Sequence, residues 1–478
     1  MSIGSASKSH QCRPGTLLGI ATALVILLFA APSTPALART PLDIELFARI
    51  GPPGQPEPVA IGPDGRVYVG TNQLGHGDAD APSKIFAFSP GGELVREYEL
   101  EGQPLDQDHG IQGLIFDRDG LLYVLDRSAD PRVVVLNPAT GKQWRYASFR
   151  DVPPCTDGPD GNCSATVLDG PAGPDYGTFS PSGDLYVTDI DQALIWRVPR
   201  GGGDAQVWLT DPRLESLFGP NGIQFMADDR TLLFANTASN PEAGDPSTGR
   251  LYTVPVQPDG GPGELTQVWE SLPFDGPDGI AIARSGNVYV ALAGANQVVL
   301  LSPQFVELAR TPPNPAANLA EEVPLDGPAS LAFLDDRLLV SNHSPIRGDP
   351  SSWAILDVYA GEPGLPLHYP GIYQPELLLE VRKGGVRHGR VRLHVRVTRH
   401  LAAIEVPVEG AKVRARRARR RPNSQGNAKL RVRGTKKRTN PQGEATLRLP
   451  RHVGRPIVVR ARKPDFTDAV KVVKRPRR

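Results

Sequence analysis

Several common signatures are missing from this chain of 478 residues. It has neither a glycine-rich phosphate-binding loop nor the strained turn that carries the nucleophile of serine hydrolases, which argues against both kinds of enzyme. Long helical periodicity is also missing, which argues against a mainly helical fold. In contrast, 50 Gly and 49 Pro punctuate regular short apolar runs. This composition indicates many short strands joined by turns.

Long hydrophobic runs are scarce. The apolar run from Leu17 to Ala31 spans 15 residues, whereas a membrane-spanning helix needs roughly 20. Basic residues precede this run, and Ala36-Leu37-Ala38 supplies the small-x-small pattern of a cleavage site. We therefore predict that residues 1–38 are a signal peptide, that the mature chain has no transmembrane segment, and that the protein is exported (secreted, periplasmic or cell-surface associated). An uncleaved anchor is the alternative.

Cysteine is rare, with three residues in all. Cys12 precedes the apolar run and would be removed with the leader. In an exported chain, the remaining Cys155 and Cys163 are expected to form a disulfide. A metal-binding pair is the alternative, but no His or further Cys lies nearby in the sequence.

A repeat runs through the first three quarters of the chain. Each copy has a start dipeptide, then a polar turn pair and an apolar triplet such as Val67-Tyr68-Val69 or Val288-Tyr289-Val290. The start dipeptides are Pro56-Glu57, Ile111-Gln112, Pro174-Asp175, Pro220-Asn221, Pro277-Asp278 and Pro328-Ala329. Their second positions are 55, 63, 46, 57 and 51 residues apart, close to the roughly 40 to 50 residues of a four-stranded propeller blade with its loops.

The repeat predicts an all-β chain with a six-bladed β-propeller over residues 39–360. In a propeller, the inner strands of all blades begin at the same rim of the central channel, so residues at one register converge. A strand from Leu42 to Ile50 is expected to close the ring by pairing with the last blade, whose strands include Trp353 to Tyr359. Closure removes exposed strand edges.

The second position of each start dipeptide is mostly polar. These positions should form a ring of Glu57, Gln112, Asp175, Asn221, Asp278 and Ala329. Such a ring is rich in oxygen ligands of the kind that hard divalent cations prefer. The sequence therefore predicts a divalent cation, with calcium as the first choice and Zn, Mn or Mg as alternatives. The other interpretation is a set of polar turn residues at an empty channel mouth.

Glu57, Pro220-Asn221-Gly222-Ile223 and Pro277-Asp278-Gly279-Ile280 together resemble the senescence marker protein/gluconolactonase/luciferin-regenerating enzyme family. The resemblance spans residues 42 to 360. It implies that Glu57, Asn221 and Asp278 bind the metal ion. It also implies that the ion polarises a lactone carbonyl while a carboxylate activates water. Asp278 is then the first candidate for the catalytic base and Asp175 the second.

Two features depart from the family pattern. The family commonly has Asn at the position of Asp175, and its sugar-lactone enzymes carry an Arg where this chain has Gly173, which argues against gluconolactone itself. Asp108-His109-Gly110-Ile111 resembles a His-Gly-Ile element of the related paraoxonase lactonases, which makes His109 a third catalytic candidate. A rim or loop histidine is the alternative for His109.

Charge divides the chain into two parts. Residues 375–478 contain 31 Lys and Arg against 7 Asp and Glu, a net charge of +24, which leaves −23 for the rest. We predict a Pro/Gly-rich linker at 361–375 and a basic β-sandwich at 376–478. The segments 408–413 and 439–449 resemble carboxypeptidase-regulatory-like or bacterial Ig-like domains. This domain is expected to bind an anionic cell-surface polymer, but not nucleic acid in a sequence-specific way, because no aromatic residues interleave its basic stretches.

The sequence thus predicts an exported, divalent-metal-dependent hydrolase whose partner is a small-molecule lactone or ester. The alternative is a non-catalytic propeller of the NHL type that binds protein or glycan at the cell surface.

Overall fold

The structure is a computed structural model. It describes residues 39–74, 80–154, 163, 171–216, 218–239 and 247–372, and in the C-terminal part 377–387, 390–401, 404–407, 412–417, 435–440, 442, 444–450, 457–462 and 469–473. The predicted signal peptide at 1–38 and Cys155 lie outside the described residues. Cys163 is disulfide-bonded. Within the described part, no helix is long and apolar enough to cross a membrane.

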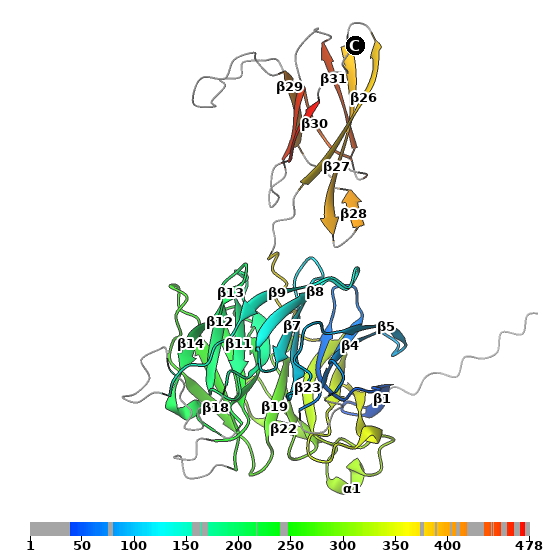
Figure 1. Ribbon diagram of the computed structural model, residues 1–478. Coiled ribbons are helices and arrows are strands. Elements are labelled where there is room, and N and C mark those ends of the chain that lie inside the picture. Colours follow the sequence, from blue (N-terminus) through cyan, green and yellow to red (C-terminus); the bar gives the residue numbers. More distant parts are fainter. Residues whose placement is uncertain are drawn as a thin grey trace, which may run out of the picture. The chain divides into compact units, whose positions relative to one another are not determined.

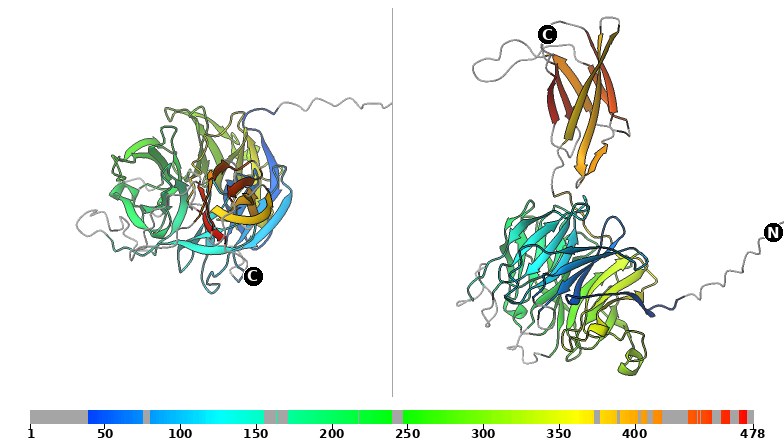
Figure 2. Two further views of the ribbon diagram at one scale, coloured as in Figure 1. Left: turned by 90° about the horizontal axis from the view of Figure 1, so that it is seen from above. Right: turned by 45° about the vertical axis from the view of Figure 1, so that its right-hand side comes forward.

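Six antiparallel blades of four strands follow one another in chain order, as the succession of colours from blue to yellow shows in Figures 1 and 2. Blade 1 contains β2 (Gln55–Ile61), β3 (Val67–Asn72), β4 (Lys84–Phe88) and β5 (Leu94–Glu99). Blade 2 contains β6 (Gly110–Phe116), β7 (Leu122–Arg127), β8 (Arg132–Leu136) and β9 (Gln143–Ser148), with the short β13 (Gly203–Asp204) added to β9. Blade 3 contains β10 (Pro174–Phe179), β11 (Leu185–Asp189), β12 (Leu194–Val198) and β14 (Gln206–Thr210).

The second half repeats this plan. Blade 4 contains β15 (Pro220–Phe225), β16 (Thr231–Asn236), β17 (Arg250–Pro255) and β18 (Thr266–Glu270). Blade 5 contains β19 (Pro277–Ile282), β20 (Val288–Leu292), β21 (Gln297–Leu301) and β22 (Glu307–Thr311). Blade 6 contains β23 (Pro328–Leu334), β24 (Arg337–Asn342), β25 (Ala354–Tyr359) and β1 (Ile44–Arg49). Short helical turns lie at η1 (Pro212–Leu214), α1 (Pro315–Asn318) and η3 (Pro350–Ser352).

The ring closes as predicted. Strand β1 pairs antiparallel with β25, from Ile44 opposite Val358 to Arg49 opposite Ala354. The first strand of the propeller therefore completes the last blade as its outer strand and holds the two ends of the ring together.

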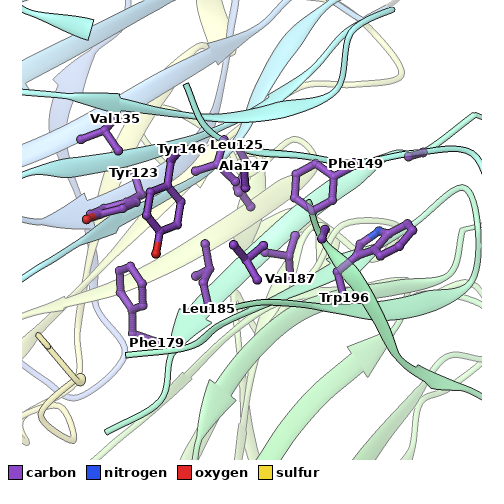
Figure 3. Close-up of a cluster of buried hydrophobic side chains, with 14 of the residues drawn as sticks. Tyr123, Leu125, Val135, Tyr146, Ala147, Phe149, Phe179, Leu185, Val187 and Trp196 are labelled. Carbon is purple, nitrogen blue, oxygen red and sulfur yellow. The ribbon is translucent and has the colours of Figure 1, made fainter. Parts of the chain in front are cut away.

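The core lies between neighbouring blades. Figure 3 shows the cluster shared by blades 2 and 3, in which the Tyr123 ring meets Phe179 edge-on at 5.0 Å. The apolar triplets supply these layers because all three positions are buried in every blade. The same apolar triplets that mark the repeat in the sequence thus also build the packing between blades.

The stretch predicted as a linker packs against the propeller over residues 361–372. Leu365 N donates to Ile282 O of blade 5 at 2.8 Å, and Arg118 N of blade 2 donates to Pro370 O at 3.1 Å. Pro363 to Tyr369, together with the inner strands of the blades, line a cavity of about 380 Å³. We call residues 361–372 the strap. It crosses one end of the central channel instead of hanging free.

The C-terminal strands form two further four-stranded sheets. One contains β26 (Leu377–Arg387), β27 (Arg390–Leu401), β28 (Ile404–Pro407) and β31 (Glu444–Pro450). The other contains β29 (Lys412–Arg417), β30 (Thr435–Arg438), β32 (Ile457–Arg462) and β33 (Ala469–Val473). Buried residues of both sheets, among them Leu393, Val395, Val413 and Val459, form one apolar cluster.

We expect the closing blade to be sensitive to cavity formation. Ile355 of β25 is fully buried among residues of blades 6 and 1, so Ile355→Ala should lower the free energy of unfolding by about 2–5 kcal/mol. Leu94 is 52% exposed, so the matched Leu94→Ala should change it by less than about 0.5 kcal/mol. Urea denaturation followed by tryptophan fluorescence measures both. Equal effects of the two substitutions would contradict the proposed closure.

Candidate metal and catalytic site

Every inner strand carries an irregularity at its start dipeptide. The pairing of β2 with β3 shifts register between Pro56 and Val59, and corresponding shifts occur at the same place in the other five blades. A β-bulge changes the direction of a side chain and bends the strand. Proline is tolerated here because the inner strand is the edge of its blade, where no ladder partner needs the N–H group. The start dipeptides are thus a shared structural device.

Neighbouring inner strands touch at these bulges. A side chain on Gly222 would place its Cβ 2.6 Å from the Asp278 carbonyl oxygen, and one on Gly279 would collide with the Ala329 carbonyl oxygen. The glycines that follow Asn221 and Asp278 therefore permit the close approach of adjacent backbones. This approach brings the second positions of the dipeptides together around the channel.

Buried oxygen atoms without hydrogen-bond partners gather in this ring. Among the described side chains, Asp175 Oδ2, Asn221 Oδ1 and Asp278 Oδ1 are inaccessible to solvent and have no hydrogen-bond partner. Asn221 Nδ2 donates to Thr237 Oγ1 at 3.1 Å, which leaves the amide oxygen unused. Leaving buried polar atoms unsatisfied costs about 1–3 kcal/mol each, and more for charged groups. A bound cation would satisfy a group of oxygens of this kind.

Electrostatics points the same way. Burial raises the pKa of Asp278 well above its ordinary value, and repulsion from Glu57 raises it further. Burial also raises the pKa of Asp175 well above its ordinary value, with further rises from Asp278 and Glu57. These three carboxylates come from blades 1, 3 and 5, yet the charge of Glu57 acts on both Asp175 and Asp278, and that of Asp278 acts on Asp175. A divalent cation would relieve both the desolvation and the repulsion.

The donor set fits a calcium-type ion in chemistry, since it offers carboxylate and amide oxygens. The described residues nevertheless contain no group of three Asp, Glu, His or Cys side chains positioned to hold a metal ion. The predicted trio of Glu57, Asn221 and Asp278 contains only two residues of these four types, because its third member is an asparagine. The assignment of these three as ligands stays a prediction.

The remaining ring positions differ in role. Gln112 is tied on both sides, because its oxygen accepts from Asn72 Nδ2 at 2.7 Å and its nitrogen donates to Asp175 Oδ1 at 3.1 Å. Gln112 therefore orients Asp175 and has no free oxygen for a cation in this arrangement. Ala329 supplies no polar group at all.

His343 of blade 6 was missed by the sequence reasoning. Its Nδ1 lies 2.5 Å from Glu57 Oε2, and its Nε2 is buried without a hydrogen-bond partner in the described structure. His343 directly follows Asn342, which comes shortly after the apolar triplet of the last blade. This place near the end of the second strand of the blade was the sequence signal that could have pointed to His343. It fills the sixth sector of the ring, where Ala329 contributes nothing.

Tyr176 was missed as well. It follows Asp175 in the bulge of β10, and its hydroxyl is buried without a partner in good hydrogen-bond geometry within the described structure. Burial raises its pKa well above the ordinary value, and the negative charges of Asp278, Glu57 and Asp175 add to the rise. The Tyr176 hydroxyl is therefore a neutral donor that faces three carboxylates.

His109 has a different position from the one expected of a catalytic base. It is fully buried, with Nδ1 2.9 Å from Gln107 O and Nε2 3.0 Å from Ala81 O. Both ring nitrogens thus face backbone carbonyl oxygens and anchor two loops. These contacts are those of a loop histidine, and a catalytic role for His109 stays a prediction.

The place of the missing arginine is occupied. A side chain on Gly173 would collide with the Asp191 carboxylate, which pairs with Arg127 at 2.7 Å. A larger residue at position 173 would have to displace this ion pair. The local packing therefore agrees with the absence of the arginine of sugar-lactone enzymes.

Comparison with known proteins identifies part of the propeller. Residues 177–321 match the family model described as SMP-30/Gluconolactonase/LRE-like region, a stretch that includes Asn221 and Asp278 but not Glu57 or Asp175. This part of the propeller thus carries the sequence pattern of that family, as predicted. No curated protein matches the chain.

Several solved structures are distantly similar to this chain. Regucalcin from Agrobacterium tumefaciens, described as a calcium-binding protein, is 19% identical with a TM-score of 0.44, covering 68% of this chain and 97% of its own. A gluconolactonase from Xanthomonas campestris is 14% identical, with a TM-score of 0.43 and coverage of 66% and 88%. Virginiamycin B lyase from Staphylococcus aureus is 14% identical, with a TM-score of 0.41 and coverage of 66% and 98%. Likenesses this distant say nothing about which reaction, if any, this chain catalyses.

The raised carboxylate pKa values predict how stability depends on pH without a cation. A carboxyl group whose pKa is higher in the folded state holds a proton that the unfolded chain releases, so stability falls as pH rises above the ordinary value of 3.8. Asp278→Asn removes this loss. In chelator, the variant should melt above the wild type at about pH 8, and the difference should vanish at about pH 4.

Calorimetric melting across this pH range provides the measurement. Glu93→Gln removes an exposed carboxylate outside the ring and serves as the control. If Asp278→Asn melts below the wild type at about pH 8 in chelator, the carboxylates do not repel one another as described.

Proposed function

We propose that the propeller is a divalent-metal-dependent hydrolase of a lactone or related small ester. The observation that carries this proposal is the ring of buried oxygens on Asp175, Asn221 and Asp278, which lack hydrogen-bond partners among the described residues and stand beside Glu57. Glu57, Asn221 and Asp278 would hold the ion, with calcium as the first choice. When bound, such an ion polarises a substrate carbonyl and stabilises the negative charge that develops on its oxygen.

The chain's own residues supply the proton chemistry. Asp278 is half-buried as a residue and stands beside Glu57 in the ring, so its carboxylate is placed to accept a proton from a water molecule in the channel. Asp278 takes a proton from water as the water oxygen bonds to the carbonyl carbon. The ester C–O bond of the lactone then breaks, and the proton passes from Asp278 to the leaving alkoxide, which gives a hydroxy acid.

Three neighbours position these groups. His343 contacts Glu57 and fixes its carboxylate, while Gln112 fixes Asp175 through Oδ1. The neutral Tyr176 hydroxyl offers a hydrogen-bond donor close to Asp278 and Asp175. Asp175 is the second candidate base, because its Oδ2 is left unused.

The site favours a substrate other than a sugar lactone. At Gly173, where sugar-lactone enzymes carry an arginine, the space is filled by Asp191 and its partner Arg127. The hydroxyl groups of a sugar lactone would therefore find no arginine side chain from this position. We therefore expect aliphatic or aromatic lactones, or small esters, to be better substrates than gluconolactone.

We also propose that the protein is exported. The disulfide at Cys163 supports this, since disulfides persist mainly in oxidising compartments. The predicted leader at 1–38 agrees with it.

Calcium should stabilise the metal-free protein. At a concentration 100 times the dissociation constant, the gain is about 2.7 kcal/mol, which thermal melting in chelator and in calcium detects. Asn221→Leu should abolish this gain without changing the net charge of the ring, and Glu93→Gln should leave it intact. If calcium, zinc, manganese and magnesium all fail to raise the melting temperature of the wild type, the non-catalytic binding propeller replaces this proposal.

Activity should depend on Asp278. A panel of aliphatic, aromatic and sugar lactones, followed by pH-stat titration of the released acid, should show hydrolysis in calcium. Asp278→Asn should lower kcat/KM by about 10²–10⁴-fold, the usual contribution of a positioned base. His109→Gln should retain most of the activity, because both of its ring nitrogens face loop carbonyls. Hydrolysis that is unchanged in Asp278→Asn would refute the mechanism.

A further inference from the structure

One face of the second C-terminal sheet carries five basic residues at outward positions of β29, β30 and β32. Val413, Ala415, Val459 and Ala461 of this sheet are buried in the apolar cluster, so the residues between them point away from it. These outward residues and their cross-strand neighbours are Lys412, Arg414, Lys436, Arg438 and Arg460, which we call the basic face.

The basic face sets like charges directly opposite one another. Lys412 of β29 pairs with Arg438 of β30, and Arg414 pairs with Lys436 on one side and with Arg460 of β32 on the other. Side chains in such pairs have Cβ atoms about 4.5–5.5 Å apart, and like charges at this distance destabilise a sheet. These pairs of like charges thus lower the stability of the folded sheet.

Nothing in this sheet neutralises that charge. Strands β29, β30, β32 and β33 contain no Asp or Glu in their sequences. In the described part of the chain, no residue of the basic face makes an ion pair. The sheet therefore lacks an internal counterion for these five cations.

The other C-terminal sheet behaves differently. There Arg396 lies opposite Glu380 on one side and Glu444 on the other, and Arg382 pairs with Glu380 at 2.7 Å. Arg392 of this sheet also lies opposite Arg448, but its strands carry Glu380, Glu405 and Glu444, whereas the strands of the second sheet carry no acidic residue. This asymmetry indicates a binding surface and not only a solubilising charge.

We propose that the basic face binds a linear, phosphate-bearing polyanion. Its cations form two rows across the strands, Arg438 with Lys412 and Lys436 with Arg414 and Arg460. Strands lie about 4.7–4.9 Å apart and alternate residues about 6.6–6.8 Å apart, so the rows present regularly spaced charges to a chain of anions. Recognition is by charge, as counterion release on binding provides the driving force.

Two other classes of partner fit less well. The four strands contain no aromatic residue, so they offer no platform on which nucleic-acid bases could stack. For the same reason they lack the aromatic anchors of membrane-surface elements. A charged polymer requires neither feature.

The test measures binding of the full chain to fluorescently labelled long-chain inorganic polyphosphate by anisotropy over a range of salt concentrations. The triple variant Lys412→Gln, Lys436→Gln, Arg460→Gln should bind at least about tenfold more weakly. Its slope of log K against log salt should be smaller by about 2, because each phosphate contact on a flexible chain contributes about 0.7. The control Arg382→Gln, Arg390→Gln, Arg396→Gln removes the same charge from the other sheet and should bind within about threefold of the wild type.

Thermal melting of each variant shows whether weaker binding comes from the lost charges or from a failure to fold. Because the substitutions remove repulsion between paired strands, the basic-face variant should be at least as stable as the wild type. If it fails to fold, Lys436→Gln alone, on the exposed strand β30, should lower the slope by about 0.7.

Three results would overturn the proposal. The first is an equal loss of affinity in both triple variants, which would make binding a property of net charge. The second is the absence of polyphosphate binding at about 0.15 M salt. The third is binding to vesicles of anionic phospholipid that depends on the basic face while polyphosphate does not bind, which would make the partner a lipid surface.

Discussion

The site depends on one backbone device, the bulge at the start of each inner strand. Because all six bulges occur at the same register, side chains from blades separated by some fifty residues meet around one channel. The glycines after Asn221 and Asp278 allow the bulged backbones to approach closely enough. The ring is therefore a product of repetition in the fold, and its chemistry is set by which residue each blade places there.

Repetition also explains what the sequence could predict. Period, turn pairs and apolar triplets are local signals, so the blades, the closing strand β1 and the ring positions follow from them. Tyr176 escaped because it stands one residue beyond the repeated dipeptide position, in the bulge of β10. His343 escaped because it follows β24, outside the repeated dipeptide, and only the fold brings it to Glu57. For His109, the motif resemblance could not show that its two ring nitrogens face the Gln107 and Ala81 carbonyls.

The strap has contacts that composition could not show. Its Pro and Gly content predicted a linker, and residues 361–372 of that stretch bond to blades 5 and 2, with Ile372 in the core between blades 2 and 3. Glycine serves here for close packing, since a side chain on Gly364 would meet Phe333 at 2.5 Å. One end of the channel is thereby covered, so access to the ring is expected from the opposite end.

The two parts of the chain handle like charges in the same way. In the propeller, buried carboxylates repel one another across the channel, and in the basic face exposed cations oppose one another across paired strands. Each arrangement costs folding free energy that a bound ion of opposite charge would return. Both proposed ligands follow from this one premise: a small cation would neutralise the carboxylates of the ring, and an extended anion would neutralise the basic face.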